Sequence, residues 1–409
     1  MILALIKLAI RNVFRNRRRS GLTLASVIIG LAALFFIQSL IKSLQADMVE
    51  RAISVFNSHI QVQSAKSDDP KVPEASFSGA ARIEEILRRD PDVLAVSKRI
   101  LFTGLIASPL NSMGVGIFSV DPKDETQLST ISSYVKKGEF IKDNGTIAIG
   151  ARIAKNLDAR VGEKIVIMAQ SRDGAFEGKA LRVAGIYETG SYTWDASMVY
   201  MTLQDAQAIL AWGGDISSIA VKIRDASALE RVEERLGKAI AVKENGLKML
   251  TWKDVSSEII HIQEFQDSVL ILVISVVFVI VALGILNTML MSLFERIREF
   301  GLMMALGAKR KHVAVLLLAE SICMGSIGLF WGAAWGLSII SVFHFIGLPL
   351  PLGEALSYFL PFGKTLYLRF AWGSHAWAVL CVILVSMAAG IIPAIRVSRL
   401  RAAEALRHV

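Results

Sequence analysis

Four stretches of the chain are almost entirely apolar and carry no Asp, Glu, Lys or Arg: residues 20–41, 268–294, 321–353 and 370–395. A helix rises about 1.5 Å per residue, so about 20 apolar residues cross the roughly 30 Å hydrocarbon layer of a membrane. Each stretch is long enough, and the pattern therefore predicts four transmembrane helices. It excludes an ordinary soluble enzyme, and it argues against a membrane β-barrel, whose strands are alternating runs of about ten residues.

The long segment between the first two apolar stretches, residues 45–267, has shorter periodicities instead. Alternating or short apolar runs predict strands, and apolar residues three or four apart predict helices. Because the two kinds interleave, we expect a mixed α/β domain, of the α+β or the α/β class. A stretch rich in Pro, Ser, Asp and Lys at 64–78 predicts a flexible loop. The predicted strands are 60–63, 93–107, 113–120, 161–169, 179–187, 197–203 and 218–223, the predicted helices are 80–89, 205–210 and 228–240, and 146–157 is predicted as a strand end followed by a helix.

Charge is distributed unevenly along the chain and predicts how it crosses the membrane. The formal net charge is +9, but residues 45–267 carry a net of −4 and the remainder +13. The basic excess lies beside the apolar stretches, so it indicates cytoplasmic ends rather than nucleic-acid binding. We expect both termini in the cytoplasm, residues 45–267 outside it, and an inner-membrane location. A cleaved signal peptide is the alternative for the N-terminus, but the first apolar stretch is too long and no small-residue cleavage site follows it.

The apolar and charge patterns together predict the boundaries of the segments. Residues 45–267 contain no cysteine, so a disulfide framework is excluded there. Apolar residues four apart extend the first two spans into this domain as helical stalks: Leu40, Leu44 and Met48 on one side, and Phe265, Val269 and Val273 on the other. The segments are a basic N-terminus 1–19, span one 20–44, the extracytoplasmic domain with stalk ends 45–267, span two 268–294, a cytoplasmic segment 295–312, span three 313–345, an outer loop 346–371, span four 372–393 and a cytoplasmic C-terminus 394–409.

Two cytoplasmic motifs and the four-span plan resemble a known family. The segment ERIREFGLMMALGAKRKHV (295–313) is similar to the coupling segment of FtsX/MacB-type ABC transporter permeases, and IIPAIRVSRLRAAEALRHV (391–409) is similar to their C-terminal ending. Within the outer domain, 150–167 and 182–210 resemble the LolC/LolE lipoprotein-releasing branch of that superfamily. The resemblance covers essentially the whole chain.

The resemblance implies that residues 295–312 contain a short helix that fits a groove of an ATPase subunit. Glu295 and Glu299 are four residues apart and are expected on one helix surface, with Arg296 in reach of Glu299. Gly301 and Gly307 are expected to allow tight turns. The other interpretation of this basic segment is a loop that holds lipid head groups. The residues predicted to couple to the ATPase are Glu295, Arg296, Arg298, Glu299, Gly301, Leu306, Gly307, Ala308 and Arg310.

No nucleotide or metal site is expected in this chain. Gly363-Lys364-Thr365 resembles the end of a phosphate-binding loop, but Tyr358 stands where that loop needs its first glycine. The six histidines have no ligand spacing. We therefore expect ATP and Mg²⁺ to be bound by a separate ATPase subunit, and we expect no cofactor and no catalytic residue here.

Small and polar residues inside the spans predict contacts between helices. Gly328, Gly332 and Gly336 are four apart, which lets helix backbones approach closely in lipid, either against another span or across a dimer. Glu320 is expected to have a structural partner, with a proton relay as the alternative. Gln38 and Asn287 are expected to make hydrogen bonds between helices.

The family resemblance implies a function by mechanotransmission. ATP binding closes the ATPase pair, the coupling helix moves, and the stalks reshape the outer domain without a pore. The lipoprotein-releasing branch implies a lipoprotein substrate handed to a periplasmic carrier, with a second permease copy or paralogue and membrane lipids as further partners. The alternatives are a MacB-like exporter of a peptide, toxin or glycolipid, and an FtsX-like regulator of a cell-wall hydrolase, for which this outer domain is large.

Two surfaces are predicted for substrate and partner. Acyl chains are expected on apolar faces of spans one and two, and the loop 170–178 is expected to be a hairpin tip that either contacts a partner or is a plain turn. The predicted substrate faces include Leu34, Phe35, Phe36, Ile37 and Leu40 on span one and Phe265, Val269, Leu272 and Val276 on span two, and the predicted partner-loop residues are Arg172, Asp173 and Phe176.

Overall fold

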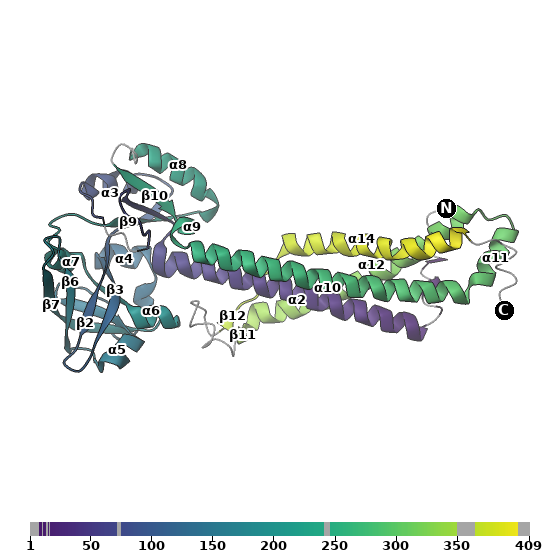
Figure 1. Ribbon diagram of the computed structural model, residues 1–409, viewed down its shortest axis with the longest axis horizontal. Coiled ribbons are helices and arrows are strands. Elements are labelled where there is room, and N and C mark those ends of the chain that lie inside the picture. Colours follow the sequence, from purple (N-terminus) through teal and green to yellow (C-terminus); the bar gives the residue numbers. More distant parts are fainter. Residues whose placement is uncertain are drawn as a thin grey trace. The chain divides into compact units, whose positions relative to one another are not determined.

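The computed structural model describes residues 8–9, 11–13, 15, 17–71, 75–240, 246–349 and 365–399. The chain divides into two compact units (Figure 1). One unit comprises Met1–Leu44, Glu264–Leu348 and Thr365–Val409, and the other comprises Gln45–Gln263 and Pro349–Lys364.

Four long helices build the first unit: α2 (Arg17–Arg51), α10 (Ser257–Glu295), α12 (Arg310–Ile346) and α14 (Trp372–Arg399). Each covers all or most of one apolar stretch and is long and apolar enough to cross a membrane. The predicted four helices are thus present. Helices α2 and α10 also continue past the apolar stretches, as the spacing of the stalk residues indicated, and a π-helical turn, Ala52–Asn57, follows α2.

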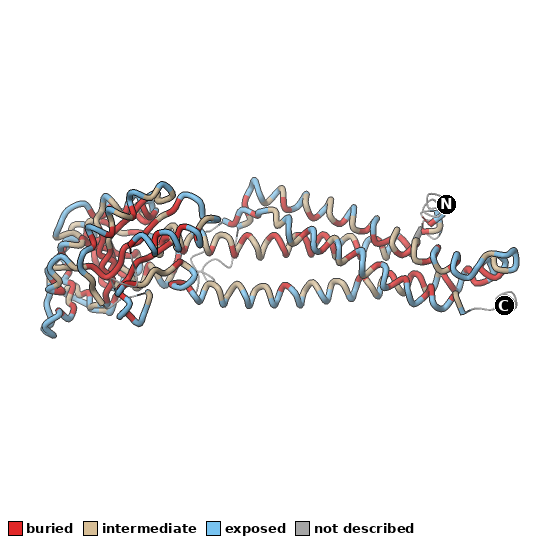
Figure 2. The backbone as a smooth tube through the Cα atoms, turned by 90° about the horizontal axis from the view of Figure 1, so that it is seen from above, coloured by how far each residue is buried: buried red, intermediate tan, exposed pale blue. Residues whose placement is uncertain are grey.

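Buried positions recur along each of these helices and face a common core (Figure 2). Val27 and Leu31 of α2, Ile285 of α10, Met324 of α12 and Val382 of α14 belong to one apolar cluster. The predicted glycine ridge lies on α12 and faces α2 of the same chain. A Cβ atom at Gly328 would lie 2.5 Å from Val27 Cγ1, one at Gly332 would lie 2.8 Å from Leu31 Cβ, and one at Gly336 would lie 2.9 Å from Phe35 Cβ. The ridge therefore packs against another span of the same chain, which is the first of the two predicted contacts.

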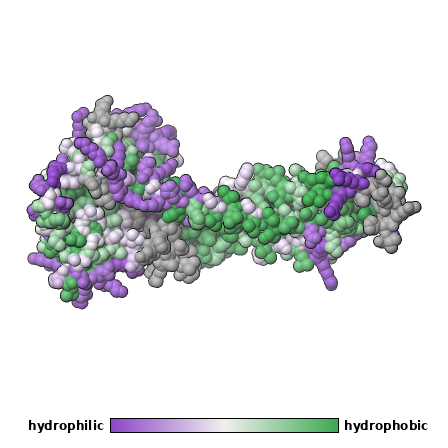
Figure 3. Space-filling model, in the orientation of Figure 1, coloured by the Kyte–Doolittle hydropathy of each residue, from purple (hydrophilic) through white to green (hydrophobic). Residues whose placement is uncertain are grey.

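Helices α12 and α14 approach each other through a reciprocal pair of small residues. A Cβ at Gly325 would lie 1.9 Å from Ser386 Oγ, and one at Gly390 would lie 2.1 Å from Ser321 Oγ. Helix α10 is packed least: 17% of its most apolar window is buried, against 39–44% for the other three helices. Its flank adds to the continuous apolar surface of this unit (Figure 3).

A ten-stranded mixed sheet forms the second unit. Its order is β10-β1-β9-β2-β3-β8-β5-β7-β4, and β6 pairs with both β2 and β7, which closes a circuit through β3, β8 and β5. Most pairs are antiparallel, but β3–β8 and β5–β7 are parallel. The strands are β1 (Ile60–Ser64), β2 (Val93–Ala107), β3 (Ser112–Val120), β4 (Val135–Gly138), β5 (Thr146–Gly150), β6 (Lys164–Gln170), β7 (Phe176–Tyr187), β8 (Met198–Thr202), β9 (Ser218–Ile223) and β10 (Leu247–Thr251).

Short helices complete this unit, and their apolar faces pack on the strands. Ile83 and Leu87 of α3 and Val232 and Leu236 of α8 are buried in one core with Val96 and other strand residues. The mixed α/β class is therefore correct, and each strand and helix predicted from the pattern is present with small shifts of its ends. The helices are α3 (Ala80–Arg88), α4 (Pro122–Leu128), α5 (Ala151–Leu157), α6 (Tyr192–Ser197), α7 (Leu203–Leu210), α8 (Leu229–Ala239) and α9 (Trp252–Val255).

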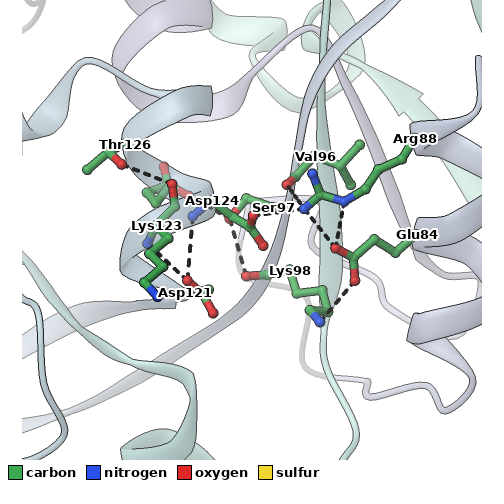
Figure 4. A network of polar contacts seen from close by, with 10 residues as sticks. Glu84, Arg88, Val96, Ser97, Lys98, Asp121, Lys123, Asp124 and Thr126 are labelled. Carbon is green, nitrogen blue, oxygen red and sulfur yellow. Dashed lines mark hydrogen bonds and ion pairs between the residues drawn. The ribbon is translucent and has the colours of Figure 1, made fainter.

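A network of charged side chains ties α3 and α4 to β2 (Figure 4). Arg88 of α3 donates to Val96 O over 3.1 Å and to Asp124 over 2.8 Å, and Glu84 binds Lys98 over 2.9 Å. The described part of 64–78 contains no helix and one isolated bridge, Phe77 to Ile216.

Candidate functional site

The predicted coupling segment forms a short helix between two sharp changes of direction. Helix α10 ends at Glu295, Arg296 breaks it with φ −112° and ψ 15°, and α11 runs from Ile297 to Ala305. The next helix, α12, begins at Arg310. Glu295 and Glu299 are therefore not on one continuous helix surface, because the break at Arg296 separates them.

Gly307 ends α11 in a left-handed conformation, with φ +97°. Its N–H bonds Met304 O over 3.1 Å, and Ala308 N–H bonds Met303 O over 3.0 Å, which is the Schellman arrangement that satisfies the last carbonyls of a helix. The predicted turn at Gly307 is present. Gly301 is not in a turn; it is a buried residue within α11.

An apolar cluster anchors α11 to the ends of three long helices. Phe300 is fully buried against Leu293 of α10, Val313 and Leu317 of α12, and Val397 of α14. Truncating a buried Phe to Ala costs about 3–5 kcal/mol in soluble proteins. The short helix is thus fixed at its inner side and can move only together with these helix ends.

A buried charged group lies beside this cluster. Arg296 Nη1 donates to Glu320 Oε1 over 2.9 Å, with side-chain exposures of only 8% and 3%. Arg296 Nε donates to Glu299 over 3.1 Å, and Asn12 Nδ2 donates to Glu320 Oε1 over 2.6 Å. The Arg296 guanidinium also lies 5.0 Å from the centre of the Phe300 ring. Glu320 therefore has structural partners, as expected, and both bind its Oε1 atom. Arg296 is buried rather than presented to another subunit.

Arginines before and at the start of α2 bind the two other acids of the segment. Arg15 makes a bidentate contact with Glu299, with Nη1–Oε2 3.0 Å and Nη2–Oε1 2.7 Å, and Arg19 Nη1 binds Glu295 over 2.7 Å. The hydrogen bonds from Arg15 hold the pKa of Glu299 below its usual range. Exposed pairs of this kind are worth only about 0.2–1 kcal/mol each, so they fix position more than they add stability.

A cavity of about 30 Å³ lies among these groups, lined by Asn12, Arg19, Thr288 and Glu320. It has room for about one water molecule and not for a metabolite.

The solvent-exposed face of α11, here called its outer side, combines apolar and cationic side chains. Leu302 and Leu306 are 55% and 80% exposed, four residues apart, and Arg298 and Arg310 are exposed nearby. Ala308 is half-buried. Two exposed leucines flanked by cations form a small apolar contact surface. Leu302 was missed from the sequence, because the family motif leaves its position less defined than the glycine and the charges around it.

The residues predicted to face substrate fall into two groups. Leu34 and Phe35 are buried, which is contrary to the expectation. Phe35 packs on Gly336 of α12 and on His375 of α14, and Leu34 belongs to the apolar core of the four helices. Phe36, Ile37 and Leu40 are half-buried, and the Phe36 ring lies 6.1 Å from that of Phe343. On α10 the predicted residues are exposed, to 68% for Phe265, 38% for Val269, 65% for Leu272 and 52% for Val276.

A buried polar cluster joins α2 to α14. His375 Nδ1 lies 3.0 Å from Gln38 Oε1, and His375 Nε2 lies 3.1 Å from Ser39 Oγ. Gln38 thus makes the expected bond between helices. Asn287 is exposed instead, so its side chain is not in the packed core.

The hairpin in the second unit is shorter at its tip than predicted, because β6 extends to Gln170 and β7 begins at Phe176. Arg172 is tied to the body of the unit: its side chain donates to Asp215 over 2.9 Å and to Ser76 over 2.6 Å. Asp173 and Phe176 are exposed, Phe176 to 75%.

An open cavity of about 610 Å³ lies in the same unit, where α3, α4 and α7 begin. Its lining includes Lys98, Lys123, Asp143, Asn144 and Gln204. The mixed charges and amides make it unsuitable for an acyl chain, which needs apolar walls.

Among the described residues no group of three His, Cys, Asp or Glu side chains could hold a metal ion. Gly363 and Lys364 of the segment that resembles a phosphate loop lie outside the described residues, as does 400–409 of the C-terminal motif.

Two family models match the chain. A MacB-like periplasmic core domain matches residues 20–239, and an FtsX-like permease C-terminal region matches residues 271–402. The periplasmic region of MacB from Actinobacillus actinomycetemcomitans is similar in structure, with a TM-score of 0.37 and 13% sequence identity over 51% of this chain and 95% of that one.

Three curated relatives show the range of proteins to which the chain is similar. The macrolide export ATP-binding/permease protein MacB of Hyphomonas neptunium is 24% identical over 86% of this chain, which spans 56% of that protein. The uncharacterized ABC transporter permease YvrN of Bacillus subtilis is 24% identical, with 98% and 99% of the two chains covered. The lipoprotein-releasing system transmembrane protein LolE of Haemophilus influenzae is 21% identical, with 93% and 92% covered. The match to the MacB-like periplasmic core domain alone covers more than half of the 409 residues of this chain. The chain therefore belongs to the FtsX/MacB-type superfamily of ABC transporter permeases.

Proposed function

We propose that this chain is the permease subunit of an ABC transporter in which a separate ATPase drives α11. The observation that carries the proposal is the two-sided character of α11. Its inner side is fixed by Phe300 and by the buried Arg296–Glu320 pair, while its outer side exposes Leu302 and Leu306. A helix that is anchored inside and apolar outside is suited to fit a groove of another subunit and to pass on its displacement.

In this proposal the termini are cytoplasmic, residues 45–267 are periplasmic and the inner membrane holds α2, α10, α12 and α14. Helices α2 and α10 carry the movement, because each continues beyond its apolar stretch into residues of the second unit. ATP and Mg²⁺ belong to the partner ATPase, and a second permease copy or paralogue completes the transporter.

For the substrate we propose a lipoprotein released to a periplasmic carrier. Exposed apolar side chains on α10, such as Phe265 and Leu272, could hold acyl chains, whereas the cavity of the second unit is polar. Extracting an acyl chain costs about 0.8 kcal/mol per CH₂ group, so ATP hydrolysis is needed. Export of a peptide, toxin or glycolipid is the second candidate, because the MacB relative is as similar to this chain as the LolE relative.

The test is docking of the ATPase. Leu302→Asp and Leu306→Asp place a charge on the outer side of α11 and should abolish co-purification of the ATPase in mild detergent while the permease stays folded. Leu110→Asp, at another exposed leucine with 72% exposure, is the matched control and should leave co-purification intact. Normal co-purification with both α11 variants would contradict the proposal. Mass spectrometry of the proteins and lipids that co-purify then separates lipoprotein release from export.

A further inference from the structure

The residues just before and at the start of α2 are distant from α11 in the chain, yet side chains join them to α11 and to the end of α10. The contacts Arg15–Glu299 and Arg19–Glu295 join residues 284 and 276 positions apart. By contrast, α11 is linked to α10 through the single residue Arg296 and to α12 through the four residues 306–309. Two of the four long helices therefore follow α11 through the peptide chain, and α2 can follow it only through non-covalent contacts.

The contacts form one connected network. Asn12 binds Glu320, Glu320 binds Arg296, Arg296 binds Glu299, and Glu299 binds Arg15 with both carboxylate oxygens. A separate pair, Arg19–Glu295, links the first turns of α2 to the last residue of α10.

The N-terminal segment is also held by packing. Val13 lies between Asn12 and Arg15 and is only 4% exposed, in the apolar core of the four helices. The segment is thus positioned on the helix bundle by an apolar residue, and its polar groups are aimed at the acids around α11.

We infer that Asn12, Arg15 and Arg19, here named the N-terminal clasp, are positioning residues that make α2 follow the movement of α11. The inference rests on the proposed function and deepens it. In a positive-inside loop these arginines would bind lipid head groups; here Arg15 and Arg19 instead bind carboxylates that flank the Arg296 break. When an ATPase displaces α11, α10 moves through its covalent link, and the clasp transmits the same displacement to α2.

The experiment uses the full chain with its ATPase in nanodiscs. Cys323→Ala and Cys381→Ala remove the two native thiols, and a spin label is placed on one exposed position at a time, Ile29 of α2 or Val279 of α10. In the parent protein, ATP should change the spectrum at both labels. In Arg15→Glu/Arg19→Glu the ATP-dependent change at Ile29 should fall at least twofold, while that at Val279 stays and the ATPase still co-purifies.

Two further variants separate a positioning role from general damage. Exchanging the charges of the separate pair, with Glu295→Arg added to Arg19→Glu, restores opposite signs without changing Glu299, which also binds Arg296, and should recover the response at Ile29 relative to Arg19→Glu alone. Arg18→Glu changes an exposed arginine of the same turn and should leave both responses intact. An unchanged response at Ile29 in Arg15→Glu/Arg19→Glu would overturn the clasp alone, as would failure of the exchange to recover it in a protein with the parent's unfolding temperature. Absence of any ATP response in the parent would overturn the proposed function, and the clasp with it.

Discussion

Arg296 and Glu320 form an ion pair at 2.9 Å in which the two side chains are only 8% and 3% exposed. The pair joins the break after α10 to the third long helix, and it is surrounded by Phe300, Glu299 and Asn12. Burying two charges is costly, so such a pair is retained where a fixed geometry is needed, and here that geometry is the attachment of α11.

Removal of Glu320 should therefore leave the Arg296 cation buried without its main partner. We expect Glu320→Ala to lower the free energy of unfolding by about 3–5 kcal/mol, measured by thermal or denaturant unfolding in detergent. Replacing both partners by apolar residues, Arg296→Met/Glu320→Leu, should recover much of this loss but still impair coupling to the ATPase. The control is Glu85→Ala, at an exposed glutamate, which should have little effect on the free energy of unfolding. An equally small effect of Glu320→Ala would show that the buried Arg296 cation is compensated elsewhere.

The glycine ridge of α12 leads to a steric prediction. A Cβ at Gly332 would lie 2.8 Å from Leu31 Cβ and 3.1 Å from Ile28 O, so Gly332→Val should separate α2 from α12 and destabilise the protein by about 1–3 kcal/mol or more. A Cβ at Gly373 would have no other heavy atom within 4 Å, so Gly373→Val should leave the stability unchanged. Unfolding temperatures in detergent compare the two, and identical values would show that α2 and α12 do not need this close approach.

Sequence patterns predicted those elements whose burial has a simple period. The four long helices are continuous apolar runs, and α3 and α8 have apolar residues at helical spacing, so both kinds were found. The missed elements lack such a pattern. Helix α4 is polar along most of PKDETQL and is defined by Asp121, which caps it by accepting from Lys123 N and Asp124 N, and β4 exposes three of its four residues.

The candidate site was predicted in composition and in one local contact, Arg296 with Glu299, but not in its long-range contacts. The motif placed Arg296, Glu299 and Gly307 in one segment, and only the structure brings Arg15, Arg19 and Asn12 to it, because these partners are more than 270 residues away in the chain. The prediction that Glu295 and Glu299 share one helix surface was wrong, because the break at Arg296 places Glu295 outside α11. A signal for long-range ion pairs exists only in the excess of arginine before α2, and that excess equally predicts contacts with lipid.

His59 should make stability depend on pH. It lies in the second unit just before β1, where burial and the nearby Lys222 lower its pKa to about 4, and its Nδ1 is buried without a hydrogen-bond partner in the described part of the chain. The unfolded chain therefore takes up a proton near pH 6.5 that the folded chain refuses until about pH 4. Stability should fall as pH decreases through this window, by at most roughly 3 kcal/mol, and this contribution should be constant below it.

The measurement compares unfolding of the parent, His59→Gln and His261→Gln between pH 7 and pH 4. Carboxylates titrate alike in all three, so only the difference between curves reports on the imidazole. The decline should be shallower in His59→Gln and unchanged for the exposed His261→Gln. Superimposable curves for the parent and His59→Gln would show that folding does not lower the pKa of His59.

The hairpin tip gives a prediction about a periplasmic partner. Phe176 is 75% exposed at the first position of β7, whereas Arg172 is committed to Asp215 and Ser76. A photocrosslinker at Phe176 should capture a partner protein if the tip is a contact, and one at Asp173, which is also exposed at the tip, should capture the same protein. Crosslinks at neither position would favour a plain solvated turn.

The packing of the four long helices predicts lateral access for substrate and no pore. A polar path through a membrane normally needs several inward polar groups. The described helices instead bury Gln38 and Ser39 against His375, and Glu320 against Arg296, so these groups are already satisfied by neighbours. Apolar side chains are exposed along α10, where Phe265 and Leu272 are 68% and 65% exposed. The measurement places single cysteines along α2 and α10 in a background without Cys323 and Cys381, and labels them with a membrane-impermeant thiol reagent during ATP turnover.

Labelling should be confined to the outer half, at positions such as Phe36, Leu40, Val269 and Leu272, and it should be strongest on α10 because Phe36 and Leu40 are half-buried. Labelling that continues along both helices to their cytoplasmic ends would reveal a water-filled path and refute transport without a pore.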